Sequence, residues 1–259
     1  MPQQLLDGLP ITAIFALFAI VSLALYEIGF RVGRWWQART PGEQEGPTGV
    51  LVGSILGLLA FLLAITMGMA SDRFDTRRGL VLEEANAIGT TYLRAGYISE
   101  PASTEVRNLL RAYVPLRIAP SDLGTLQANV ARSQELLDDL WVIAEDVARS
   151  PEANDVTALF IESLNETIDL NTTRTIAGVY ARVPETILWL LVGGSVLTLA
   201  MVGYSAGTTG QRSVLTALVL VLAFGAVITL VIDIDRPRDG FIQVSQVPMI
   251  QLMERLGPP

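Results

Sequence analysis

Four long runs of apolar residues constrain the fold of this chain more than any other feature of its sequence. They cover Ile11–Phe30, Val50–Ala70, Ile187–Gly203 and Val214–Ile232. A helix needs roughly 20 apolar residues to cross the hydrocarbon core of a bilayer, and these runs come close to that length. A spanning segment must also satisfy its backbone hydrogen bonds internally. The sequence therefore predicts an all-α integral membrane protein with four transmembrane helices.

The composition excludes several classes of function. Of the residues, 51% are hydrophobic and 17% are charged, which is typical of a membrane protein. Cysteine and histidine are both absent, so the commonest transition-metal ligands and the usual general base are missing. We therefore expect no metal, no cofactor and no enzymatic activity, and we interpret the acidic pairs Glu83–Glu84 and Asp138–Asp139 as solvated helix faces. The net charge of −8 argues against binding to nucleic acid.

The first run is interpreted as a retained span because it leads into Arg31, Arg34 and the pair Trp35–Trp36 rather than into a cleavage site. Glu27 lies near its end, either at the membrane interface or on an ion path. Seven arginines flank the spans on one side and four on the other. The positive-inside rule then places the N-terminus, the region between the second and third spans, and the C-terminus in the cytoplasm.

The region between the second and third spans is polar enough to be soluble, and its apolar residues recur at helical spacing. We predict an antiparallel helical bundle interrupted at Pro101, Pro115 and Pro120, with a further helix capped at Ser150–Pro151. The predicted organisation is a short N-terminal segment (1–10), the first two spans (11–70), a cytoplasmic helical domain (71–184), the last two spans (185–234) and a cytoplasmic tail (235–259).

The second span carries a stripe of small residues along one face. Its members recur every three or four residues: Gly49, Gly53, Gly57, Ala60, Ala64 and Gly68. Small residues let another helix approach closely. The partner is either a helix of the same subunit or a copy of this helix in an assembly around an axis.

Motifs beyond the membrane runs resemble those of the bacterial bestrophin-like family, and more distantly those of the bestrophins. The second span continues without a helix breaker into Asp72-Arg73-Phe74 and then into Glu83-Glu84-Ala85-Asn86-Ala87-Ile88; the last span is followed by Asp233-Ile234-Asp235-Arg236-Pro237. The resemblance implies a homopentameric ion channel in the inner (plasma) membrane of a bacterium, conducting monovalent ions. It also implies a hydrophobic neck lined by the second span, at Gly57, Phe61 and Ile65.

The charged residues at the span ends leave two interpretations open. Asp233, Asp235 and Arg236 form either a local ion-paired turn fixed by Pro237 or a charged ring at a cytoplasmic pore mouth. Asp72 and Arg73 leave the second span at a matching depth, and we expect them to pair with this segment. For the whole protein, the first hypothesis is an oligomeric channel with the second span lining the pathway. The alternative is a membrane-anchored scaffold or sensor whose helical domain binds a partner without moving ions.

Overall fold

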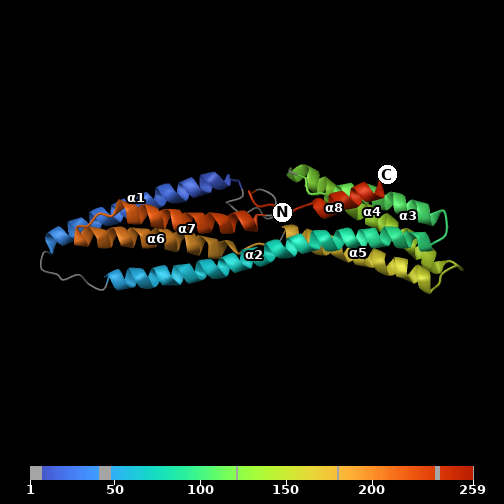
Figure 1. Ribbon diagram of the computed structural model, residues 1–259, viewed down its shortest axis with the longest axis horizontal. Helices are drawn as coiled ribbons and strands as arrows, with labels where there is room; N and C mark the ends of the chain where they lie inside the picture. The colour runs from blue at the N-terminus through green and yellow to red at the C-terminus, as the bar shows by residue number, and fades with distance from the viewer. Residues whose placement is uncertain (1–7, 41–47, 121, 180, 237–239, 259) are drawn as a thin grey trace. The chain divides into compact units, whose positions relative to one another are not determined.

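The computed structural model describes residues 8–40, 48–120, 122–179, 181–236 and 240–258, and these contain helices but no strand. The longer helices are α1 (Ile11–Arg39), α2 (Thr48–Arg94), α4 (Leu123–Arg149), α5 (Asp155–Val179), α6 (Glu185–Thr209) and α7 (Val214–Asp235) (Figure 1). The shorter ones are α3 (Ala102–Leu116), α8 (Val247–Leu256) and a 3₁₀ turn, η1 (Ala95–Tyr97).

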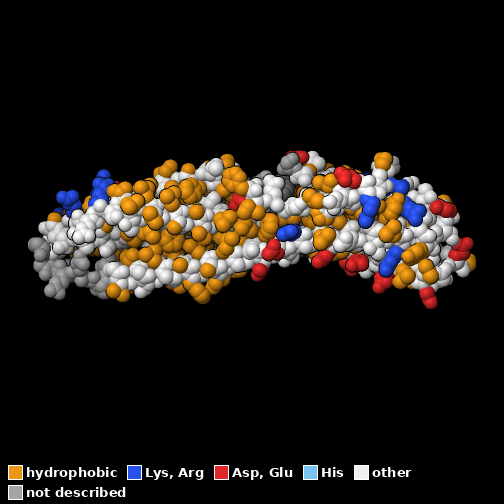
Figure 2. Space-filling model, viewed as in Figure 1, with side chains coloured by type: hydrophobic (Ala, Val, Ile, Leu, Met, Phe, Trp, Pro, Cys, Tyr) orange, Lys and Arg blue, Asp and Glu red, His pale blue; other side chains and the backbone are white. Residues whose placement is uncertain are grey.

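The chain divides into two compact units. Met1–Arg73 and Arg182–Ile242 form one, which we call the membrane unit, and Phe74–Ala181 with Gln243–Pro259 form the other, the helical unit. α2 belongs to both, because it continues without a break from its apolar run into the polar segment. Among the described residues, four helices are long and apolar enough to cross a membrane, namely α1, α2, α6 and α7. Figure 2 shows hydrophobic side chains over much of the visible surface of the membrane unit, as expected of side chains that face lipid.

Glycines bring α1 and α6 into backbone contact. A Cβ atom at Gly29 would overlap the carbonyl oxygen of Ala200, and one at Gly33 would overlap that of Tyr204. Gly203 and Gly207 of α6 face the backbone of α1 in the same way. Each helix thus contributes a pair of glycines four residues apart, the spacing that allows close helix packing in lipid. The sequence analysis did not single out these pairs.

The helical unit has a single core to which α8 contributes. Its fully buried side chains come from every helix of the unit: Ile88, Leu110, Tyr113, Leu137, Leu140, Phe160, Leu164, Met249 and Leu252. The segment predicted as a tail thus includes a helix whose apolar face completes the core of this unit.

The prediction that Ser150–Pro151 caps the next helix was wrong. Ser150 ends α4, and α5 begins only at Asp155. The cap of α5 is Asn154, whose Oδ1 accepts hydrogen bonds from the backbone N–H groups of Val156 (2.8 Å) and Thr157 (3.1 Å). Pro115 lies within the last turn of α3, which ends at Leu116, so the helix is interrupted where the sequence predicted.

Candidate functional site

The three residues expected to line a pore lie on an exposed face of α2. Phe61 is 62% exposed and Ile65 is 46% exposed in the subunit. Gly57 is exposed as well, and a Cβ atom built on it would meet nothing within 4 Å. Their spacing of four residues stacks them along the helix. One face of α2 therefore presents large apolar side chains that no described part of the subunit covers.

The small-residue stripe shares this lack of cover. Cβ atoms at Gly49, Gly53 and Gly68 would also meet nothing within 4 Å, and both alanines of the stripe are exposed. A different face of α2 packs within the membrane unit, and its buried residues are Val52, Leu59, Leu63, Thr66 and Ala70. Leu59, for example, reaches Gly194 of α6. No described part of the subunit therefore packs against the stripe.

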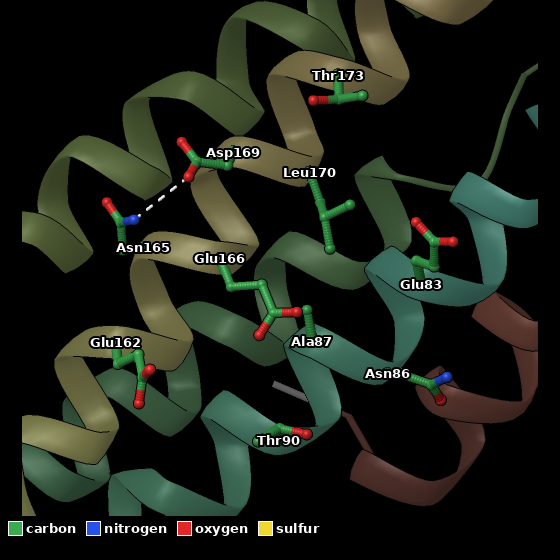
Figure 3. Close-up of a pocket in the computed structure, with 10 residues that line it drawn as sticks. All are labelled: Glu83, Asn86, Ala87, Thr90, Glu162, Asn165, Glu166, Asp169, Leu170 and Thr173. Atoms are coloured by element: carbon green, nitrogen blue, oxygen red, sulfur yellow. Dashed lines mark hydrogen bonds between the residues drawn. The ribbon is translucent and has the colours of Figure 1, made fainter.

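In the helical unit, α2 and α5 form the walls of an open cavity of about 650 Å³, which we call the acidic groove (Figure 3). It is lined by Glu83, Asn86, Ala87, Thr90, Glu162, Asn165, Glu166, Asp169, Leu170 and Thr173. Its four carboxylates are exposed. The side chain of Glu166 extends from α5 toward α2 (Figure 3), and Asn165 Nδ2 donates to Asp169 Oδ2 at 3.3 Å. An open cavity of this charge attracts cations.

Behind the groove lies a buried charge network that the sequence analysis missed. Glu84 is completely buried, so the prediction of a solvated Glu83–Glu84 pair was wrong for this residue. Its carboxylate accepts hydrogen bonds from Arg117 Nε (2.6 Å), Arg174 Nη1 (2.5 Å) and the Tyr113 hydroxyl (3.1 Å). Arg174 also donates to Gln246 Oε1 at 2.9 Å. The network thereby joins α2, α3, α5 and the segment before α8.

Burial and neighbouring charges shift the pKa values of two side chains in this network, Tyr113 and Arg117. Burial raises the pKa of the Tyr113 hydroxyl far above its usual range, and the neighbouring Glu84 adds to the shift. Burial opposes the charge on Arg117, but the pKa of this guanidinium is nevertheless raised, since Tyr113 and Glu84 lie beside it. Both side chains therefore keep their protons near neutral pH. The signal for Glu84 was present in the sequence, because it lies three residues after Val81 and four before Ile88, both of which are buried.

The aspartates after the last span are buried and bonded locally. Asp233 accepts hydrogen bonds from the backbone N–H groups of Phe241 (2.9 Å) and Ile242 (3.0 Å). Asp235 accepts from the backbone N–H of Val183 (2.9 Å) and from Arg182 Nε (3.3 Å). These contacts are those of a structural turn, although Pro237 itself lies outside the described residues.

The remaining charges near the spans have the following positions. Arg236 donates to the carbonyl oxygen of Leu9 at 2.9 Å. Asp72 is exposed and Arg73 is half-buried, and their expected pairing with the last span stays a prediction. Glu27 is ion-paired with Arg31 (2.9 Å) and Arg212 (2.6 Å) at one end of the membrane unit, which favours the interfacial interpretation over an ion path.

No group of residues suited to a metal ion occurs in the described parts of the chain.

Comparison with known proteins places these features in a family. A family model for the bestrophin-like domain matches residues 13–249. The chain belongs to the bestrophin-like family. A search of curated proteins finds no match to this bestrophin-like protein. Among solved structures, it is similar to a variant of a bacterial bestrophin homolog from Klebsiella pneumoniae. The TM-score is 0.68 and the sequence identity is 13%, and the match covers 95% of this chain and 98% of the other. A second structure of that homolog, phased with zinc, has a TM-score of 0.66 and 12% identity over 95% of each chain. The bestrophin-like protein therefore shares the fold of these structures and is a multi-pass membrane protein.

Proposed function

We propose that this bestrophin-like protein is an oligomeric ion channel and that α2 lines its ion pathway. The observation that carries the proposal is the exposed face of α2 in the membrane unit. Phe61 and Ile65 are exposed there, beside a stripe of small residues against which no described part of the subunit packs. A helix with such a face is suited to meet copies of itself around an axis.

Rings of apolar side chains can close a narrow pore by excluding water. Phe61 and Ile65, repeated in each copy, would form two such rings, one turn apart. Gly57 offers no bulk, so the constriction would depend on the other two. A homopentamer is the assembly that the family resemblance implies. Monovalent ions are the proposed cargo, and the four exposed carboxylates of the acidic groove favour cations over anions.

The proposed orientation places the N-terminus, the helical unit and the C-terminus in the cytoplasm of a bacterium, with α1, α2, α6 and α7 crossing the inner membrane. It is supported by the excess of arginines on that side of the spans, seven against four. In this orientation the acidic groove faces the cytoplasm, where it would concentrate cations before they enter the pore.

Ion flux from liposomes tests the proposal. The purified protein is reconstituted, and flux of a monovalent cation is compared for the wild type, Phe61→Ala and Ile65→Ala. Leu222→Ala is the matched control, because Leu222 is an exposed apolar residue of α7 outside the proposed pathway. We expect wild-type flux, a severalfold increase in both α2 variants as the rings lose bulk, and no change in the control.

Two results would count against the proposal, in different ways. A wild-type protein that carries no flux, while native mass spectrometry shows an intact oligomer, would favour the scaffold or sensor alternative. Flux that is unchanged by both α2 substitutions would instead leave a channel whose pathway lies elsewhere. A monomer in native mass spectrometry would remove the assembly on which the pore depends.

A further inference from the structure

Three arginines of the helical unit lie along the α2 segment from Gly89 to Gly96, and we call them the arginine cluster: Arg107, Arg111 and Arg255. The guanidinium carbons of Arg107 and Arg111 lie 5.5 and 5.3 Å from the centroid of the Tyr92 ring. Arg111 donates to the Tyr92 hydroxyl (2.5 Å) and to the carbonyl oxygen of Leu256 (2.9 Å), the residue after Arg255. The cluster therefore lies where α2, α3 and the end of α8 meet.

Two glycines make room for the cluster. Gly89 and Gly96 are seven residues apart, on either side of Tyr92. A Cβ atom at Gly89 would lie 2.7 Å from Arg255 Nη2, and one at Gly96 would lie 2.6 Å from Arg107 Nη2. Glycine inside a helix costs roughly 0.5–1 kcal/mol relative to alanine. The close approach of a guanidinium to the backbone gives a physical reason for glycine at both positions.

The arginine cluster has no carboxylate partner among the residues that the structure describes. The acceptors of Arg111 are neutral, namely a phenol, a backbone carbonyl and the side chain of Asn108. Nε of Arg107 is buried without an acceptor. Glu105 and Glu254 are near in sequence, yet neither forms an ion pair with the cluster.

Other arginines of the same unit differ in this respect. Arg117 and Arg174 bind Glu84, and Arg132 and Arg149 pair with acidic residues of their own helix. Guanidinium groups that have no carboxylate partner keep their full positive charge, and a multivalent anion would supply the missing counter-charge. The planar fork of a guanidinium matches the geometry of a phosphate group and binds it through paired, charge-assisted hydrogen bonds.

We propose that the arginine cluster is a binding site for a phosphate group, held between α3 and the C-terminal end of α8. Inorganic phosphate, a phosphomonoester and a phospholipid headgroup present the same chemistry. Arg255 is exposed, and Arg107 and Arg111 are half-buried, so the ligand would reach the site from solvent. The site does not depend on whether α2 lines a pore.

Calorimetry with inorganic phosphate tests the site on the full-length protein in detergent, at constant ionic strength and with chloride as the reference anion. The double variant Arg107→Gln/Arg255→Gln removes two of the three charges. Arg149→Gln is the control, because Arg149 is an exposed arginine that pairs with Glu145. We expect saturable binding to the wild type and the control, and a dissociation constant raised about tenfold or more in the double variant.

A second variant covers the case in which the double variant fails to fold. Gly89→Ala keeps every charge, but its Cβ would displace the head of Arg255. It should therefore weaken phosphate binding while circular dichroism shows unchanged helix content. Glycerol phosphate and a short-chain phosphatidic acid in mixed micelles distinguish the sources, since the tighter binder identifies the natural class.

Two results would overturn the proposal. The first is absence of saturable phosphate binding to the wild type, and the second is equal affinity in the wild type, the double variant and Gly89→Ala.

Discussion

Replacing Glu84 with glutamine should destabilise the helical unit far more than the same change one residue earlier. Glu84 is completely buried, and its carboxylate compensates the charges of Arg117 and Arg174. Breaking a buried ion pair by removing one partner costs about 3–5 kcal/mol. The side chain of Arg174 keeps 13% exposure, and glutamine retains one acceptor oxygen. We therefore expect a loss near the lower limit, about 3 kcal/mol.

Hydrogen exchange measured by mass spectrometry on the full-length protein reports this loss locally. A decrease of about 3 kcal/mol in the free energy of opening corresponds to roughly 100-fold faster exchange. The effect should appear in peptides around Glu84, Tyr113 and Arg174. Glu83→Gln is the matched control, because Glu83 is exposed and a surface substitution usually changes stability by less than about 0.5 kcal/mol. Similar exchange rates in the two variants would refute the assignment of a charge-compensating role to Glu84.

Two further predictions concern the membrane unit and the groove. Gly33→Ala should lower the stability of the membrane unit by about 1–3 kcal/mol, because its Cβ overlaps the carbonyl oxygen of Tyr204. The matched control is Gly193→Ala in α6, where a Cβ atom would meet nothing within 4 Å, so this variant should not lose stability. Thermal unfolding in detergent measures both, and equal melting temperatures would contradict the packing described for α1 and α6. The double variant Glu83→Gln/Glu166→Gln should reduce the preference for cations, measured as a shift in reversal potential under a salt gradient, and an unshifted potential would remove the acidic groove from the conduction path.

The sequence predicted the helical membrane fold well because the responsible signals are local. Length and apolarity are sufficient to identify a spanning helix, and the absence of a breaker after Ala70 indicated that the second span continues. The burial of Glu84 was not predicted, because the pair Glu83–Glu84 was interpreted as a whole as solvated. Its helical spacing from Val81 and Ile88 nevertheless places Glu84 on the buried face of the helix. Periodicity has to be applied to charged residues as strictly as to apolar ones.

Other features depend on residues far apart in the chain, and no local pattern predicts them. The close contact of α1 with α6 joins Gly29 and Gly33 to residues some 170 positions later, so neither glycine pair reveals its partner by itself. The arginine cluster likewise combines α3 with the end of α8. The exposed state of the small-residue stripe could also not be predicted, since its spacing is the same whether its partner lies within the subunit or in another copy.

Thiol accessibility tests most directly whether α2 lines the ion pathway. The protein has no cysteine, so Ile65→Cys introduces a single thiol on the proposed pathway and Leu222→Cys introduces one on an exposed face of α7. A charged, water-soluble thiol reagent is applied to reconstituted protein during a flux measurement. The account predicts that modification blocks most of the flux in the Ile65→Cys variant and leaves the Leu222→Cys variant unaffected. Unchanged flux after complete labelling at position 65 would contradict it.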